Sequence, residues 1–268
     1  MQKSASRQQT IVEQLTAHRQ LYVTNLARQL NVSEATIRKD LRSLEDSGLI
    51  KRVHGGAVPV RGRLMSQEVD FVTRAQAQLD EKQAIAQAAI EYIHDHDSIL
   101  LDASSTCYQL ANLLRNTTLQ LTIVTNGIQT AGLLAENKLL RVFVVGGLLR
   151  SNNAMSGLLG TGLFSRVHVS KAFVSARGVD PEHGLTDFNL EEVELKSFMV
   201  QQVNEVIALV DHTKIGRVSV AEFCAVDRIT TLITDAVASP DVTHGLSELG
   251  INIRRVASHA PTSPEVPR

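Results

Sequence analysis

The feature that most restricts the fold is a regular alternation of short apolar runs and helix-like segments from residue 80 onward. Helical patterns such as DEKQAIAQAAIEYI (80–93), CYQLANLL (107–114) and VTHGLSELG (242–250) separate the apolar runs. Strands that alternate with helices predict an α/β domain with a largely parallel sheet covered by helices. The expected strands are SILL (98–101), LTIV (121–124), VFVV (142–145), KAFV (171–174), VIALV (206–210), TTLIT (230–234) and INIRRV (251–256).

Charge is distributed unevenly between the two ends of the chain. Residues 1–63 carry 11 Lys and Arg against 5 Asp and Glu, whereas the remaining residues carry 16 against 23. A basic N-terminal part on an acidic body indicates that the N-terminal part binds a polyanion. Chance clustering of basic residues is the alternative. The spacing of these residues along the chain distinguishes the two interpretations.

Three short helical patterns occupy the basic part. Apolar side chains mark one face of each pattern: Ile11, Val12 and Leu15 in the first, Leu26, Ala27 and Leu30 in the second, and Ile37, Leu41 and Leu44 in the third. Thr24 and Ser33 are candidate N-caps of the second and third helices, and Gly48 can end the third. This order predicts a helix-turn-helix whose third helix reads DNA.

The outward side of the third helix carries the residues that could contact a duplex. Its early polar side chains could reach base edges, and its basic side chains could bind phosphates or guanine edges. A basic hairpin follows, LIKRV–HGG–AVPV, which makes the module a winged helix-turn-helix. The alternative is a three-helix module with a solvated basic face. The predicted DNA contacts are Ser33, Glu34, Thr36, Arg38, Lys39, Arg42, Lys51 and Arg52.

Polar or glycine-rich turns follow four of the predicted strands. Ligands of parallel α/β sheets bind at the carboxyl ends of strands. Hydroxyls and free amides at a helix N-terminus suit a phosphate, and glycines allow a ligand to approach the backbone. Each turn alone could be only an N-cap or a tight turn. Together they predict a site for a phosphorylated sugar or polyol, made of Asp102, Ser104, Ser105, Thr106, Thr125, Asn126, Gly127, Gly146, Gly147, Arg150, Asp211 and Lys214.

Two other polar groups suggest simpler roles. In the helix NLEEVELKSFMV (189–200), Glu191, Glu192, Glu194 and Lys196 predict an exposed face with local ion pairs. His94 and His96, with Asp95 and Asp97, resemble metal ligands, but they lie where a polar turn is expected and no further His or Cys is clustered with them. We predict no metal site and no cofactor.

The rest of the sequence limits the location of the protein. No apolar run approaches the roughly 20 residues needed to cross a bilayer, and the N-terminus lacks an apolar signal core. Cys107 and Cys224 are the only cysteines, which suits a reducing compartment. We expect a cytoplasmic protein without a membrane partner.

The sequence resembles the DeoR-type bacterial transcriptional regulators over about residues 7–256. The resemblance rests on the T-I-R-K-D-L core (36–41), the H-G-G-A wing (54–57), the Asp102–Thr106 loop, the Thr125-Asn126 pair, the Gly146–Arg150 loop, Gly178-Val179-Asp180 followed by His183-Gly184-Leu185, and the Asp211–Gly216 loop. It implies a helix-turn-helix over 23–42 and a sensor domain related in fold to ribose-5-phosphate isomerase and CoA transferases. It also implies a homodimeric or homotetrameric repressor of a carbohydrate operon, released from double-stranded operator DNA by a sugar phosphate.

Three residues depart from the family pattern. Ser104 stands where the family has a glycine, and Ser175 and Arg177 stand where it has small or neutral residues. Arg177 could add a contact to an anion. An isomerase-like enzyme with a DNA-binding head is the alternative function, in which Asp102 or Asp211 would act as a base, but the lysine-glycine loop of the isomerases is absent.

Four segments follow from these patterns. We expect a winged helix-turn-helix DNA-binding domain at 1–60, a linker at 61–79, an effector-binding sensor domain at 80–256 and a disordered tail at 257–268. Residues 59–79 contain a proline, a glycine and no clear period, and the tail contains three prolines.

Overall fold

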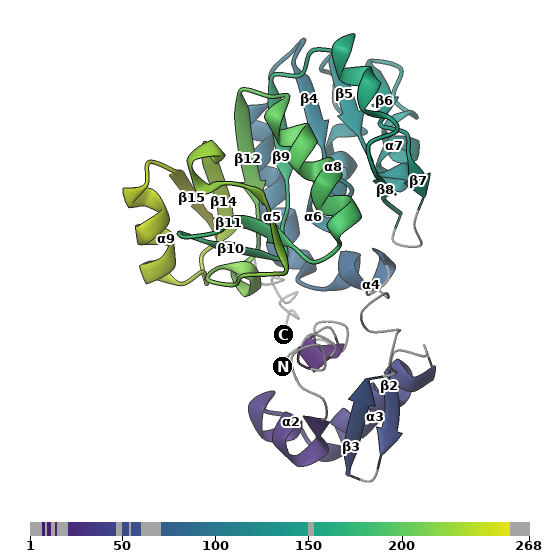
Figure 1. Cartoon of the computed structure of the whole chain (residues 1–268), viewed down its shortest axis with the longest axis vertical. Helices are drawn as coiled ribbons and strands as arrows, with labels where there is room; N and C mark the ends of the chain where they lie inside the picture. Colours follow the sequence, from purple (N-terminus) through teal and green to yellow (C-terminus); the bar gives the residue numbers. More distant parts are fainter. Residues whose placement is uncertain are drawn as a thin grey trace, which may run out of the picture. The chain divides into compact units, whose positions relative to one another are not determined.

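The computed structural model describes residues 7–8, 10–11, 14, 21–46, 50–53, 55–59, 71–149 and 153–257 (Figure 1). The chain divides into two compact units, Met1–Gln78 and Leu79–Arg268. The predicted tail, apart from Ala257, lies outside the described residues. So do Gly48 and His54, Val12 and Leu15 of the first helical pattern, and linker residues 61–70.

The first unit contains a helix-turn-helix and a small antiparallel sheet. Helix α2 (Val23–Gln29) and helix α3 (Glu34–Asp46) flank a turn in which Asn31 has a φ of 52°, a left-handed conformation that Asn tolerates. Strands β1 (Leu21–Tyr22), β3 (Gly56–Pro59) and β2 (Ile50–Val53) pair antiparallel in the order β1-β3-β2. The predicted winged helix-turn-helix is therefore confirmed.

The first residues of α2 and α3 can be compared with the predicted N-caps, Thr24 and Ser33. The Ser33 hydroxyl accepts a hydrogen bond from the Thr36 amide at 3.2 Å, so Ser33 caps α3 as predicted. Helix α2 instead begins at Val23 after Tyr22, and Tyr22 offers no side-chain cap. The prediction that Thr24 is the N-cap is wrong, because the chain turns from strand β1 directly into the helix.

A compact apolar core joins the helices to the sheet of the first unit. Ile37, Leu41 and Leu44 are 0%, 1% and 5% exposed, as the spacing of the third pattern predicted. Burying each such side chain contributes about 2 kcal/mol. They pack with Ile11, Val23, Leu26, Ala27, Ile50 and Ala57.

One buried ion pair ties the start of the chain to the recognition helix. Arg7 donates from Nη2 to Asp40 Oδ1 at 3.1 Å and from Nε to Oδ2, and Gln8 donates to the same carboxylate at 3.3 Å. Arg7 and Asp40 are both buried. The sequence pattern did not reveal this pair, because its partners lie 33 residues apart.

The second unit is built on a seven-stranded parallel sheet of order β15-β14-β12-β9-β4-β5-β6. All seven predicted strands are present, within one or two residues at each end. They are β4 (Ser98–Leu101), β5 (Leu121–Thr125), β6 (Leu140–Val144), β9 (Lys171–Val174), β12 (Glu205–Leu209), β14 (Thr231–Asp235) and β15 (Asn252–Val256).

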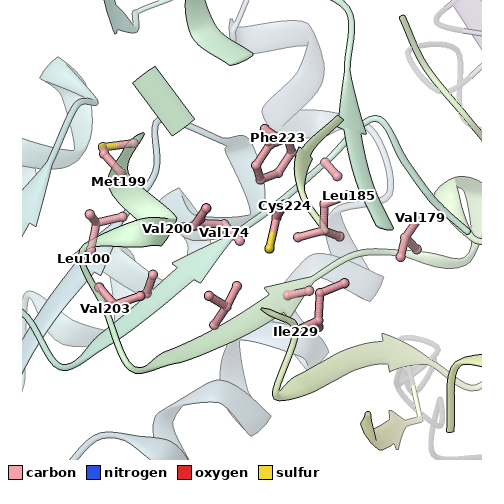
Figure 2. Close-up of a cluster of buried hydrophobic side chains, with 14 of the residues drawn as sticks. Leu100, Val174, Val179, Leu185, Met199, Val200, Val203, Phe223, Cys224 and Ile229 are labelled. Atoms are coloured by element: carbon pink, nitrogen blue, oxygen red, sulfur yellow. The ribbon is translucent and has the colours of Figure 1, made fainter. Parts of the chain in front are cut away.

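Side chains alternate between the two faces of this sheet. Ile99, Leu101 and Phe173 pack on one face with helices α5 (Leu79–Ala89), α6 (Ser105–Leu114) and α7 (Ile128–Leu134). Leu100, Val174 and their neighbours pack on the other face with helix α8 (Leu190–Gln201), and Figure 2 shows this second cluster. Helix α9 (Pro240–Glu248) adds Leu246 to that cluster.

Several short elements were not predicted. Strands β10 (Gly178–Asp180), β11 (Gly184–Asp187) and β13 (Ala221–Cys224) form a separate antiparallel sheet, and β7 (Leu148–Leu149) pairs with β8 (Met155–Ser156). Short 3-10 helices cover Ile90–Tyr92, Thr161–Ser165, His212–Lys214 and Val226–Arg228. Helix α4 (Phe71–Gln76) lies in the range expected to be a linker.

Helix α8 corrects one expectation. Glu191 and Glu194 are exposed as predicted, but Lys196 is buried. The prediction of an exposed charged face is therefore wrong for Lys196. This lysine is buried because it pairs with Asp102 and Asp187, which lie outside the helix.

Removing the Asp40 carboxylate should destabilise the first unit. In Asp40→Ala the buried Arg7 guanidinium loses the Asp40 carboxylate, so we expect the opening free energy of the α3 amides to fall by about 3 kcal/mol. Hydrogen exchange of the full chain measures this unit separately from the other. Asp46→Ala, an exposed change on the same helix, is the control, and equal protection in both variants would contradict the assignment.

Candidate functional site

The chain order of the sheet reverses beside β4. From β4 the chain adds β5 and then β6 on one side, and it returns to place β9, β12, β14 and β15 on the other side. Such a reversal opens a crevice at the carboxyl ends of the strands, where α/β proteins bind ligands. The loops that follow β12, β9, β4, β5 and β6 are therefore neighbours at one edge of the sheet, as the sequence predicted for four of them.

The loop after β4 presents the start of helix α6. Ser104 is its N-cap: the hydroxyl accepts from the Cys107 amide at 3.1 Å and the carbonyl accepts from the Tyr108 amide at 3.0 Å. The first four amides of a helix have no partner within it, so the amides of Ser105 and Thr106 remain available. The Ser105 hydroxyl makes no hydrogen bond within the described parts of the chain. This helix start can accept an anion.

Asp102 supports this loop from beneath. Its carboxylate is fully buried and accepts from the Ser104 amide at 3.0 Å and from the Ser175 amide at 2.9 Å. Both oxygens are thus used by the protein itself. Asp102 fixes the loop and joins β4 to β9. Its contact with a ligand stays a prediction.

Ser175, directly after β9, connects the loops of three adjacent strands. Its hydroxyl accepts from Lys214 Nζ at 3.1 Å and lies 3.5 Å from the Thr106 hydroxyl. The sequence singled out Ser175 only as a departure from the family pattern. The sign that could have revealed it is that KAFV, like LTIV, is followed directly by a hydroxyl side chain.

In the loop after β12, the Asp211 carboxylate is attracted to two lysines. Asp211 accepts from the Thr213 amide at 3.1 Å and from the Thr213 hydroxyl, and it lies 3.4 Å from Lys214 Nζ. Burial would raise the pKa of Asp211, but the charges of Lys214 and of Lys82 in α5 outweigh burial and lower it to about 2. Asp211 therefore stays ionised and holds Lys214 beside Ser175.

His212 turns toward the neighbouring strand. Its Nδ1 lies 2.9 Å from Asp235 Oδ2, and its amide donates to Oδ1 of the same carboxylate at 2.7 Å. The hydrogen bond to Asp235 raises the pKa of His212. This pair anchors the Asp211–Lys214 loop to the end of β14.

The loop after β5 leaves buried polar atoms without partners. Thr125 Oγ1 accepts from the Gly127 amide at 3.1 Å, and Asn126 Nδ2 donates to the Met155 carbonyl at 3.0 Å. A Cβ at Gly127 would lie 3.1 Å from Ala103 Cα, so glycine lets the β4 and β5 loops meet. The buried atoms that have no hydrogen-bond partner in the described structure include Asn126 Oδ1, Thr130 Oγ1 and Asn153 Nδ2.

The two glycines after β6 differ in how closely other atoms pack against them. A Cβ at Gly147 would lie 2.4 Å from the Ser156 carbonyl oxygen, whereas a Cβ at Gly146 would meet nothing. Close backbone packing therefore accounts for Gly147. Arg150, expected to contact an anion, lies outside the described residues.

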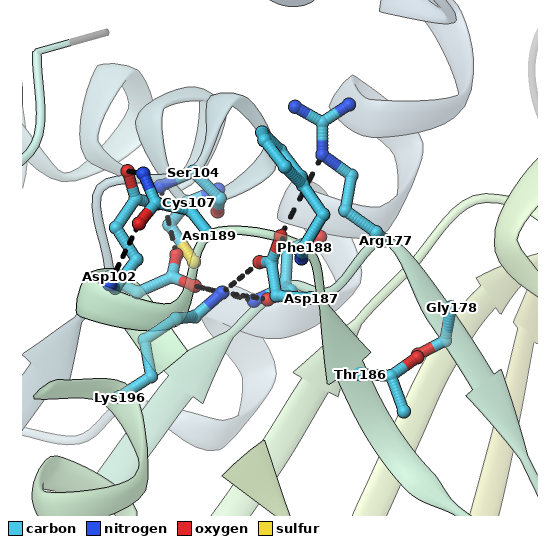
Figure 3. Close-up of polar contacts among 12 residues, drawn as sticks. Asp102, Ser104, Cys107, Arg177, Gly178, Thr186, Asp187, Phe188, Asn189 and Lys196 are labelled. Carbon is cyan, nitrogen blue, oxygen red and sulfur yellow. Dashed lines mark hydrogen bonds and ion pairs between the residues drawn. The ribbon is translucent and has the colours of Figure 1, made fainter. Parts of the chain in front are cut away.

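A buried ionic network lies behind these loops (Figure 3). Lys196 Nζ donates to the Ser175 carbonyl at 2.7 Å and to Asp187 Oδ2 at 3.0 Å, and it lies 3.2 Å from Asp102 Oδ2. Burial would lower the pKa of Lys196, but Asp187 and Asp102 outweigh it and raise that pKa. Arg177 lies 3.9 Å from Asp187 and over the Phe188 ring. Sequence reasoning missed this network.

The first unit presents the predicted DNA contacts on α3 and the wing. Arg38, Lys39 and Arg42 are exposed on the outer side of α3. Arg38 is paired with Glu34 at 2.8 Å, and Arg52 of the wing is paired with Glu45, which lowers the pKa of Glu45. Within the described residues, Lys39 and Arg42 make no ion pair, so their charges face solvent. Ser33 and Lys51 are exposed, and Glu34 and Thr36 are partly exposed.

Two other classes of site were sought among the described residues. No group of three or more His, Cys, Asp or Glu side chains there could hold a metal ion; His94 and His96 pair with Asp97 and Asp95 in a turn. In the same part of the chain, no helix has the length and apolar character needed to span a bilayer.

Replacing the buried lysine should destabilise the second unit in a pH-dependent way. In Lys196→Met, Asp102 and Asp187 lose their cation, and we expect the free energy of unfolding to fall by about 3 kcal/mol at neutral pH. Unpaired buried carboxylates have raised pKa values in the folded state, so this deficit should shrink as the pH falls toward about 4. In the unsubstituted chain the lowered pKa of Asp187 acts oppositely, giving stability above about pH 4 that is lost at lower pH.

Urea unfolding at several pH values measures this effect. Lys138→Met, an exposed change on the same unit, is the control. A Lys196→Met variant as stable as the control, or a deficit that grows on acidification, would contradict the network.

Known proteins resemble both units. Residues 7–61 match the DeoR-like helix-turn-helix domain and residues 77–236 match the DeoR C terminal sensor domain. GolR, an HTH-type transcriptional regulator of Listeria innocua, is 40% identical over 230 residues, covering 85% of this chain and 89% of GolR. The HTH-type transcriptional repressor CsqR of Escherichia coli is 33% identical over 235 residues, covering 86% and 87%.

Part of the chain also resembles a solved structure. Ribose 5 phosphate isomerase A of Neisseria gonorrhoeae aligns with 53% of this chain and 54% of its own, with 16% identity and a TM-score of 0.37. The curated relatives are transcriptional regulators, so this chain is a regulator and not an enzyme. The chain belongs to the DeoR family of helix-turn-helix transcriptional regulators.

Proposed function

We propose that this chain represses a carbohydrate-utilisation operon and that a phosphorylated sugar or polyol releases it from its operator. The observation that carries the proposal is the junction of Lys214, Ser175 and Thr106 beside the open start of α6. A cation, hydroxyls and free amides meet there at the reversal point of the sheet. The name of CsqR as a repressor supports the direction of regulation.

The chemistry of the junction favours a phosphate over a neutral group. The Ser105 and Thr106 amides and the Ser105 hydroxyl can donate to phosphate oxygens, and the positive end of the α6 dipole adds to the attraction. Lys214 supplies a point charge beside them. Asn126 Oδ1, a buried acceptor without a partner in the described structure, would suit a sugar hydroxyl.

The same loop offers a route by which a ligand affects the rest of the chain. Asp211 is attracted both to Lys214 in the junction and to Lys82 in α5, the first helix after the boundary between the units. If a phosphate attracts Lys214 away from Asp211, the Asp211 carboxylate interacts more strongly with Lys82. A ligand can shift a conformational equilibrium only through such a difference between states.

Binding to a palindromic operator requires two copies of the helix-turn-helix. One helix-turn-helix reads a half-site, and dimers place two recognition helices about 34 Å apart on a palindromic operator. We therefore propose a homodimer, or a homotetramer made of such dimers, that presents two α3 helices to successive turns of the major groove.

DNA affinity should depend more on Arg42 than on Arg38. Arg42 is exposed and makes no ion pair with the described residues, whereas Arg38 already bonds to Glu34. We expect Arg42→Ala to weaken binding by about tenfold and, if the lost contact is to phosphate, to reduce the salt slope by about one unit. Arg38→Ala should have a smaller effect.

A salt-titrated gel shift on the region upstream of the protein's own gene measures both quantities. Arg254→Ala, an exposed arginine on the sheet edge of the second unit, is the control. An Arg42→Ala variant that binds like the control would remove Arg42 from the interface.

Effector response should depend on Ser105 and Lys214. Ser105→Ala and Lys214→Met remove donors to the phosphate, so we expect normal DNA binding, at least tenfold weaker ligand binding and no release. Lys82→Met should still bind ligand but release DNA less, because it removes the second partner of Asp211.

A thermal-shift screen with phosphorylated sugars and polyols identifies the ligand, and a gel shift with that ligand then measures release. Lys138→Met is the control. Normal release by both Ser105→Ala and Lys214→Met would place the effector elsewhere.

A further inference from the structure

Exposed apolar side chains are concentrated in one part of the second unit. Seven large apolar residues between positions 139 and 159 are exposed, and Leu159 is 92% exposed. Monomeric proteins seldom expose large contiguous apolar patches, and such patches mark interaction sites. We call this group the β6 patch; it comprises Leu139, Phe143, Val144, Leu148, Leu149, Leu158 and Leu159.

The chain folds back on itself to bring these residues together. Strand β7 pairs with β8, and the Ser156 carbonyl lies against Gly147. A Cβ at Gly160 would lie 2.2 Å from the Gly146 carbonyl oxygen, so the Leu158-Leu159 segment returns to the end of β6. Figure 1 shows β6, β7 and β8 on the same side of this unit. The end of β6, the β7–β8 hairpin and the Leu158-Leu159 segment therefore lie together.

The two edges of the parallel sheet differ in chemistry. Strand β15, at one edge, carries Asn252, Arg254 and Arg255, side chains that discourage pairing with another protein. Strand β6, at the other edge, carries exposed Phe143 and Val144 together with exposed Arg141, and residues 142–149 contain no polar side chain. The Leu140 amide turns back to the Asn137 carbonyl at 3.1 Å, and no strand among the described residues pairs with the outer edge of β6. The β6 edge is therefore the more apolar of the two.

We propose that a second copy of this chain covers the β6 patch across a two-fold axis. The seven side chains of the patch are apolar, and an apolar surface is complementary to itself, as an isologous interface requires. The inference rests on the proposed function, because a regulator with one half-site reader in each chain needs a two-fold partner. The C-terminal segment of the same chain is poorly suited to cover the β6 patch. It follows β15, at the opposite edge of the sheet, and residues 257–268 contain one large apolar residue, Val266.

Sedimentation velocity of the full chain, without DNA or effector, tests this surface. We expect the unsubstituted chain to form dimers or larger even assemblies, and Leu148→Glu and Leu159→Glu to raise the dissociation constant at least tenfold. Leu249→Glu is the matched control, because Leu249 is 52% exposed and Leu148 is 53% exposed. Leu159 is almost fully exposed, so its replacement should leave folding intact.

The outcomes separate this proposal from the proposed function. A monomeric unsubstituted chain, or assembly of both patch variants like that of Leu249→Glu, would overturn the interface. An assembled protein that binds no operator or ignores every sugar phosphate would count against the proposed function and leave the interface standing.

Discussion

The candidate effector site depends on the buried ammonium group of Lys196. This one charge from α8 bonds to Asp102 after β4, to the Ser175 carbonyl after β9 and to Asp187 at the end of β11. A buried ion pair seldom stabilises a fold more than apolar packing of similar volume does, but its hydrogen bonds fix the orientation of the groups that they join. They hold the loops after β4 and β9 in one conformation. Ser175 is thereby placed between Thr106 and Lys214.

The parallel sheet could be predicted because each strand carries its signal locally. Buried strands such as SILL and KAFV are apolar on both sides, and both became strands with the predicted bounds, β4 and β9. Ile37, Leu41 and Leu44 follow the same logic at helical spacing. In these segments the side chains alone determine which face is buried.

Elements that depend on distant partners could not be predicted in this way. Lys196 lies among glutamates at spacings typical of an exposed helix face, and its burial depends on Asp102, Asp187 and the Ser175 carbonyl. The antiparallel sheet of β10, β11 and β13 has strands of three or four residues. A Cβ at Gly178 would lie 2.1 Å from the Arg217 carbonyl oxygen, a constraint that the sequence does not reveal.

Asn126 links the candidate effector site to the β6 patch. Its carbonyl accepts from the Met155 amide at 2.8 Å, and its side-chain amide donates to the Met155 carbonyl at 3.0 Å. Met155 pairs directly with Leu149 of the patch. The remaining side-chain oxygen of Asn126 is buried and has no partner among the described residues. A ligand that bonds to this oxygen would therefore act on the residue that holds the β7–β8 hairpin in place. In the proposed mechanism, effector binding and subunit contact would then share the Asn126 side chain.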